Sequence, residues 1–213
     1  MLIYAGIDEA GYGPMLGPLC VGCSVFAIAD HDPGQGKVDL WKHLSRAVCR
    51  KKSDRKHRIA IDDSKHLKGA SKGKTHPLKH LERGVLSFLA ASENNPHDLP
   101  ETDVELFDLL DTRLSKAPWY DSVTELPVAN DLGQLRIATS RLQRIMRERQ
   151  VHCSSMGVEV VDAGPFNRQV DLMGNKASVN FGAVMKHVDR IWGRWPAEHP
   201  RVIVDRQGGR TTI

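Results

Sequence analysis

Two neighbouring acids, Asp8 and Glu9, follow directly on an apolar run at residues 2–7. Adjacent carboxylates repel each other and are costly to bury unless a cation neutralises them. The chain then alternates glycine with proline, from Gly11 to Pro18, in a turn where the backbone can approach a ligand closely. The pattern predicts a site for Mg²⁺ or Mn²⁺ beside a glycine-rich loop that holds phosphate.

A third acid, Asp205, ends another apolar run, Val202–Val204. Divalent cations held by carboxylates at strand ends activate a water and stabilise the leaving oxygen in phosphodiester hydrolysis. Asp8, Glu9 and Asp205 meet this need if the first and last strands lie side by side. Taken alone, Asp205 is better explained as a strand end that caps a turn, and pairing with a nearby lysine is an alternative for Glu9.

Three segments together resemble the ribonuclease HII family. Gly6 to Leu19 is similar to its opening motif, and Asp63-Ser64-Lys65-His66-Leu67 to its Asp-Ser-Lys-Lys-Leu segment. Residues 201–205 resemble its apolar strand ending in a metal-binding aspartate, and residues 170–186 loosely resemble the preceding helix. The resemblance implies an α/β fold of the ribonuclease H-like type, a mixed β-sheet flanked by helices. It also implies Asp8, Glu9 and Asp205 as catalytic ligands of Mg²⁺ or Mn²⁺.

The resemblance also implies nucleic-acid contacts. The backbone of the glycine turn is expected to read the 2′-hydroxyl of a ribonucleotide, which both donates and accepts a hydrogen bond. Two residues of the second motif are expected to contact phosphate. The basic, glycine-rich element after Asp205 is predicted to contact phosphate too, with a flexible turn as the open alternative. The residues of the glycine turn are Gly11, Tyr12 and Gly13, and those of the second motif are Ser64 and Lys65. The residues of the element after Asp205 are Arg206 and Arg210.

The chain departs from the family pattern at three places. Tyr12 stands where the family usually has arginine, and Arg206 where it usually continues with glycine. The family's fourth carboxylate lies further along, beyond Ile213. We therefore expect a fragment that lacks the C-terminal part of a longer protein; a divergent branch with a different site is the alternative.

Charge is distributed unevenly along the chain. Residues 41–83 contain 14 Lys or Arg against four acids, whereas residues 84–131 contain two against ten. A basic block suits a polyanionic partner, because Lys and Arg bind phosphates. A solvated helical surface is the plainer alternative.

Periodicity predicts one α/β domain over residues 1–213 with an insertion at 92–130. Helices are expected at 41–50, 77–91, 131–150 and 177–192, with Asn130 or Asp131 as the N-cap of the third, and strands at 2–8, 19–29, 158–161 and 202–204. The first two strands are expected to pair antiparallel. Asp62 and Asp63 are interpreted as turn caps, with a further metal position as the alternative. Cys20 and Cys23 lie in an expected buried strand and are interpreted as structural, since no second pair completes a zinc site. No run reaches membrane-spanning length, so we expect a soluble, cytoplasmic protein with no membrane partner.

The leading functional hypothesis is a metal-dependent endoribonuclease that hydrolyses RNA in RNA–DNA hybrids or ribonucleotides embedded in duplex DNA. Tyr12 and the missing fourth carboxylate favour an alternative, a catalytically impaired nucleic-acid-binding module of the same fold. A third interpretation is a different nuclease of that fold, such as a junction resolvase, which recognises structure and not ribose.

Overall fold

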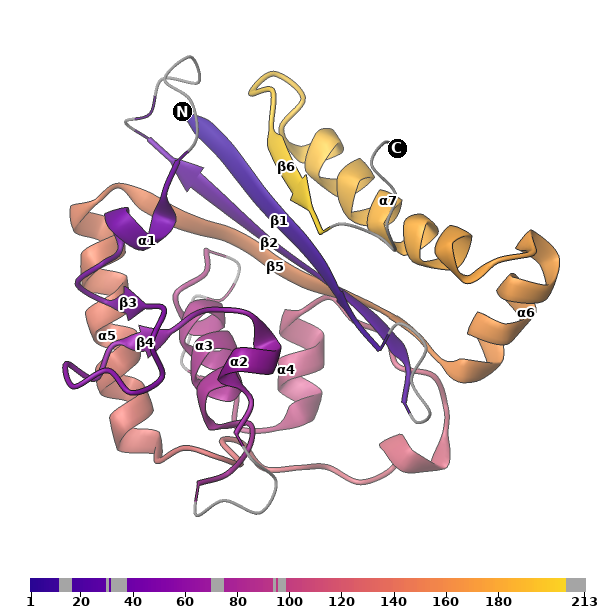
Figure 1. The fold of residues 1–213 in the computed structure, drawn as a ribbon, viewed down its shortest axis with the longest axis horizontal. Coiled ribbons are helices and arrows are strands. Elements are labelled where there is room, and N and C mark those ends of the chain that lie inside the picture. The colour runs from indigo at the N-terminus through magenta and orange to yellow at the C-terminus, as the bar shows by residue number, and fades with distance from the viewer. Residues whose placement is uncertain are drawn as a thin grey trace. The chain divides into compact units, whose positions relative to one another are not determined.

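A computed structural model describes residues 1–11, 17–29, 31, 38–69, 75–93, 95 and 99–205. The chain divides into two compact units, and Figure 1 labels the helices and strands of each. We call Met1–His31, Phe107–Ser122 and Ser154–Ile213 the sheet unit, and Asp32–Leu106 with Val123–Cys153 the helical unit. The segment 92–130, expected to be an insertion, is shared between the two units, and the expectation of one domain stays a prediction.

A four-stranded mixed sheet, in the order β5-β2-β1-β6, organises the sheet unit. Strand β1 (Leu2–Ala10) pairs antiparallel with β2 (Leu19–Ile28), as the sequence predicted. On its other side β1 pairs parallel with β6 (Arg201–Val204), so the first and last described strands are neighbours. Strand β5 (Val151–Val161) lies beside β2 and begins in the helical unit.

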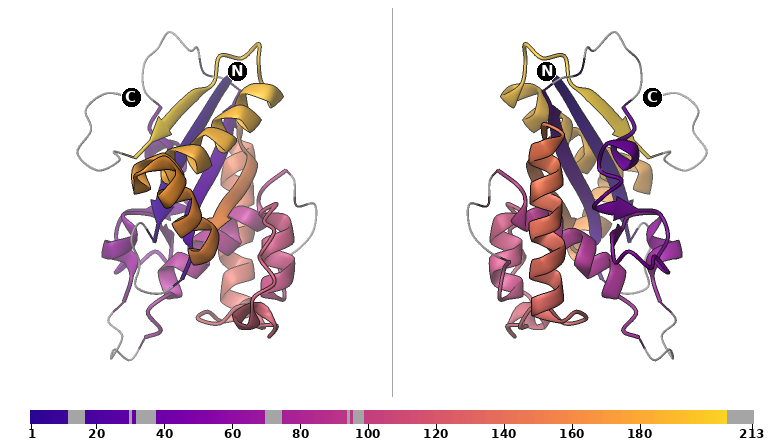
Figure 2. Two further views of the ribbon diagram at one scale, coloured as in Figure 1. Left: turned by 90° about the vertical axis from the view of Figure 1, so that its right-hand side faces the viewer. Right: turned by 90° about the vertical axis from the view of Figure 1, so that its left-hand side faces the viewer.

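Helix α7 (Lys176–Arg194) runs along one face of this sheet (Figure 2). Asn175 caps it by accepting a hydrogen bond from the Ser178 amide at 2.8 Å. Helix α6 (Ala163–Met173) precedes it and ends at Gly174, which adopts a left-handed conformation. Alternate residues of β1 and β2 pack against α7 to form the core: Ile3, Ala5, Ile7, Leu19, Val21, Val25, Ala27, Val179, Ala183, Val184 and Ile191.

The helical unit packs α3 (Lys79–Ala90) against α5 (Leu132–Glu148). Asp131 caps α5 through the amide of Gln134 at 2.9 Å, as expected from the sequence. Two short parallel strands, β3 (Val48–Cys49) and β4 (Ile59–Ala60), form a second sheet. The other elements of the described chain are α1 (Leu40–His43), α2 (Ser64–Leu67), the 3₁₀ turn Pro118–Tyr120, and α4 (Asp103–Leu109), which reaches into both units.

Most of the expected elements are confirmed, but the helix expected at 41–50 is wrong. Helix α1 ends at His43, and Val48 and Cys49 form β3 instead. Two tertiary contacts outweigh the helical spacing there: Val48 pairs with Ile59, and the Trp41 indole donates to the Ile61 carbonyl oxygen at 2.9 Å. Strand β5 is also longer than expected, and α6 was not predicted.

No helix within the described ranges is both long and apolar enough to cross a lipid bilayer. The four cysteines are free, and Cys23 packs against the core of the sheet unit. The structural interpretation of Cys23 agrees with this packing.

Candidate metal centre

The parallel pairing of β1 with β6 places Asp205 beside the acidic end of β1. Ile7 pairs with Val204, and the Asp205 amide donates to the Ile7 carbonyl oxygen at 3.1 Å. Both strands run in the same direction, so the residues that follow Ile7 and Val204 emerge at the same edge of the sheet. The condition that the sequence set for a three-carboxylate site, adjacent first and last strands, is therefore met.

Asp8 and Glu9 point to opposite faces of β1, because successive residues of a strand alternate. Glu9 continues the row of Ile3, Ala5 and Ile7 and lies on the side covered by α7, where it is half-buried. Asp8 is exposed, and its Oδ1 accepts a hydrogen bond from the Glu9 amide at 2.8 Å. One acid is thus open to solvent, whereas the other borders the core.

The carboxyl group of Glu9 has a raised pKa. Burial is the main cause, and the charge of Asp8 adds to it; Asn180 lowers the pKa by hydrogen bonding, and the charge of Asp205 raises it further. Each of these acids makes ionisation of Glu9 more costly, which is the electrostatic condition that a bound cation relieves.

Asn180 on α7 is a residue that the sequence did not single out. Its side chain is 1% exposed and influences the Glu9 carboxyl, yet neither amide atom completes a hydrogen bond of ordinary geometry with a described residue. An unsatisfied buried amide costs about 1–3 kcal/mol. The available signal was an amide within a mainly apolar stripe that includes Val179, Ala183 and Val184, with His187 as its other buried polar residue.

The donors suit a hard divalent cation, since carboxylate and amide oxygens are the ligands that Mg²⁺ and Mn²⁺ prefer. Even so, no three His, Cys, Asp or Glu side chains of the described residues converge closely enough to hold a metal ion. Asp8, Glu9 and Asp205 therefore share one edge of the sheet without forming a compact ligand group. Asn180, which interacts with the Glu9 carboxyl, is placed to orient that carboxylate from the core side of the edge.

The glycine turn begins at Gly11, whose φ is +81°. A side chain there would place its Cβ 2.4 Å from the Pro18 carbonyl oxygen, so only glycine fits this close approach. The other predicted residues of the turn, Tyr12 and Gly13, lie outside the described residues. So do Arg206 and Arg210 of the basic element after Asp205.

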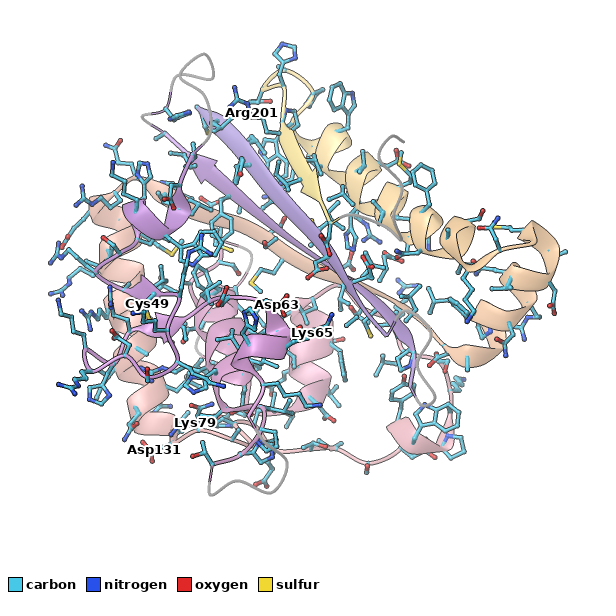
Figure 3. All side chains as sticks on the ribbon, in the orientation of Figure 1. Cys49, Asp63, Lys65, Lys79, Asp131 and Arg201 are labelled. Carbon is cyan, nitrogen blue, oxygen red and sulfur yellow. The ribbon has the colours of Figure 1, made fainter. Side chains whose placement is uncertain are left out.

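The second motif lies in the helical unit (Figure 3). Asp63 caps the short helix α2 by accepting from the Lys65 amide at 2.7 Å, as the turn-capping interpretation of Asp63 expected. Ser64 and Lys65 are exposed. Asp62 faces Arg50 and His66, with nitrogen–oxygen distances of 3.9 and 3.5 Å. The phosphate contacts of Ser64 and Lys65 stay a prediction.

Comparison with models of protein families, with curated proteins and with solved structures finds no match to this chain.

Proposed function

We propose that this chain is a metal-dependent endoribonuclease of the ribonuclease H-like type. Its substrates are RNA in RNA–DNA hybrids or ribonucleotides embedded in duplex DNA. The observation that carries the proposal is the β1–β6 pairing, which brings Asp205 to the edge where Asp8 and Glu9 stand. The ribonuclease HII-like motifs supply the substrate class.

Each acid has a distinct part in this proposal. Asp8 presents its carboxylate to solvent, where a substrate phosphate is proposed to bind. Glu9 lies on the α7 side of the sheet, near Asn180. Asp205 is fixed through its own amide to β1. Bound Mg²⁺ or Mn²⁺ supplies an activated water and stabilises the leaving oxygen. Gly11 lies at the end of β1, in a close approach to the Pro18 carbonyl that only glycine allows, and the glycine turn that it begins is proposed to read the 2′-hydroxyl.

The test is cleavage of a DNA duplex that carries one ribonucleotide, in Mg²⁺ and in Mn²⁺. We expect cutting beside the ribonucleotide and a loss of at least a hundredfold in Asp8→Asn, because losing a ligand exceeds the 10–100-fold typical of losing its outer partners. Asp189→Asn is the matched control, an exposed carboxylate on α7 of the same unit. Equal activity of Asp8→Asn and wild type would overturn the proposed site.

A non-catalytic nucleic-acid-binding module is the second candidate. The absence of a compact three-ligand group among the described residues favours it, together with Tyr12 at the position of the family's arginine. This candidate predicts duplex binding without cutting, and a melting temperature that does not respond to Mg²⁺. Cutting of a branched DNA junction without ribonucleotides would instead support a resolvase.

A further inference from the structure

The helical unit carries an exposed cationic surface that combines two segments far apart in the sequence. One is the loop 50–58 between β3 and β4, and the other is the outer face of α5. The Arg141 guanidinium on α5 donates to the Lys56 carbonyl oxygen at 2.9 Å, and Arg46 pairs with Glu148 at the end of α5. The Arg141 bond places the loop directly beside the helix, and the Arg46 pair ties the segment before β3 to the end of α5.

The one acid in the loop is used to shape it. Asp54 pairs with the Arg58 guanidinium at 2.8 Å and also accepts from the amides of Lys56 and Arg58 at 3.1 and 3.0 Å. Its side chain is only 11% exposed, whereas the cations around it face solvent. Asp54 therefore organises the loop and leaves its exposed surface positive.

On α5 the arginines form a row. Arg136, Arg144 and Arg147 fall within about 80° of one another around the helix axis, at 100° per residue. The only acid of the helix, Glu148, already pairs with Arg46 and lies 3.9 Å from Arg144. Six exposed cations of this surface have no carboxylate partner among the described residues: Lys51, Arg55, Lys56, Arg136, Arg147 and Arg149.

We infer that this surface binds the phosphate backbone of a nucleic-acid duplex. Arg136 and Arg147 are separated by about 16 Å along the helix, which matches roughly five base-pair steps of one strand. Leu135, Leu142, Ile145 and Met146 of α5 are buried in the protein, so this stripe is not free to insert into a lipid surface. The exposed Leu132 and Ile137 lie about 140° apart around the helix axis and form no continuous apolar stripe. The loop 50–58 and α5 contain no Trp, Tyr or Phe, and the cations that dominate this surface are expected to contact phosphates, so the contacts carry affinity and not base sequence.

The identity of the partner rests on the proposed function, but the surface itself lies outside the candidate metal centre. The two are tested separately by measuring binding without metal. A fluorescein-labelled DNA duplex carrying one ribonucleotide is titrated in EDTA between 50 and 200 mM salt, and anisotropy gives the affinity. The triple variant Lys56→Gln/Arg136→Gln/Arg147→Gln is compared with wild type.

Each lost phosphate contact lowers the slope of log affinity against log salt by about 0.9. The slope of the triple variant is therefore expected to be about 2.7 smaller in magnitude than that of wild type. Between 50 and 200 mM salt, the affinity of wild type should then fall about 40-fold more than the affinity of the triple variant. Arg113→Gln/Lys116→Gln/Arg168→Gln is the matched control, with three exposed cations of the sheet unit. Its slope is expected to stay closer to that of wild type.

An unchanged slope in a triple variant with the wild-type melting temperature would overturn the inference. Loss of binding to vesicles of anionic phospholipid, with duplex binding intact, would overturn it in favour of a membrane surface. If wild type fails to cut while the triple variant still loses its salt dependence, the proposed function fails and this surface stands. If wild type cuts and the triple variant binds like wild type, only this surface fails.

Discussion

The two units differ in where they keep their polar groups. The sheet unit buries Asn180, His187 and Asp162 against or beside its core, and it holds Glu9 at the core's edge. The buried polar groups of the helical unit are small hydroxyls and one amide, and its many cations face solvent. Buried polar groups are pre-oriented and suited to chemistry, whereas exposed cations suit the capture of a polyanion. We therefore expect the sheet unit to carry the chemistry and the helical unit to bind the polyanion.

The largest expected effect is on stability, and it tests whether the helix that carries the exposed arginines, α5, is held in place by its buried apolar face. Leu142 of α5 is fully buried, so Leu142→Ala should lower the free energy of unfolding by about 2–5 kcal/mol. Urea denaturation followed by circular dichroism measures it. Ile137→Ala on the same helix is the control, because Ile137 is 72% exposed and its truncation should cost less than about 0.5 kcal/mol. Equal costs for the two would mean that α5 is not held by its apolar face.

The next effect concerns the buried amide of the sheet unit. Asn180→Leu should weaken Mn²⁺ binding by about 10–100-fold, the usual cost of losing a group that orients a ligand. In metal-free buffer the free energy of unfolding of the same variant should exceed that of wild type. The reason is that the substitution removes a buried amide that has no well-formed hydrogen bond. Titration calorimetry and urea denaturation report the two quantities.

Asn167→Leu, at an exposed position on α6, serves as its control. Undiminished Mn²⁺ affinity in Asn180→Leu, with affinity lost in Asp8→Asn, would show that Asn180 only fills space.

The smallest effect is a pH dependence that belongs to the sheet unit. Burial lowers the pKa of His187, although its contact with the Val21 carbonyl oxygen at 2.9 Å and the charge of Glu159 raise it; Arg190 and Lys186 lower it further. The folded state therefore keeps His187 neutral below its ordinary pKa of about 6.5, while the unfolded chain takes up a proton. The stability from His187 is fully present above this value and is lost as pH falls toward the lowered pKa.

Urea denaturation of wild type and His187→Gln between pH 8 and pH 5.5 measures this dependence. The stability difference between the two proteins should shrink as the solution becomes more acidic. His199→Gln, at an exposed position of the same unit, is compared in parallel. A difference that is constant across the range would contradict the assignment.

Sequence reasoning was most successful where one physical signal dominated. The apolar runs at 2–8 and 202–204 and the apolar stripe with its Asp131 cap predicted β1, β6 and α5. It failed at residues 41–50, where strand pairing with Ile59 decided the structure, because such a partner is invisible in a local pattern. It also overlooked Asn180, since an amide within an apolar stripe acquires meaning only when β1 is known to lie opposite.

The join between β1 and β6 has a consequence for the timing of synthesis. Tyr4 pairs with Arg201, so β1 acquires this neighbour only after almost the whole described chain has been made. At 5–20 residues per second, that interval is about 10–40 s. During it, the hairpin of β1 and β2 has an open edge, and Asp205 has not yet reached Asp8 and Glu9. A nascent chain therefore cannot assemble the candidate centre until Asp205 has been synthesised and β6 has paired with β1.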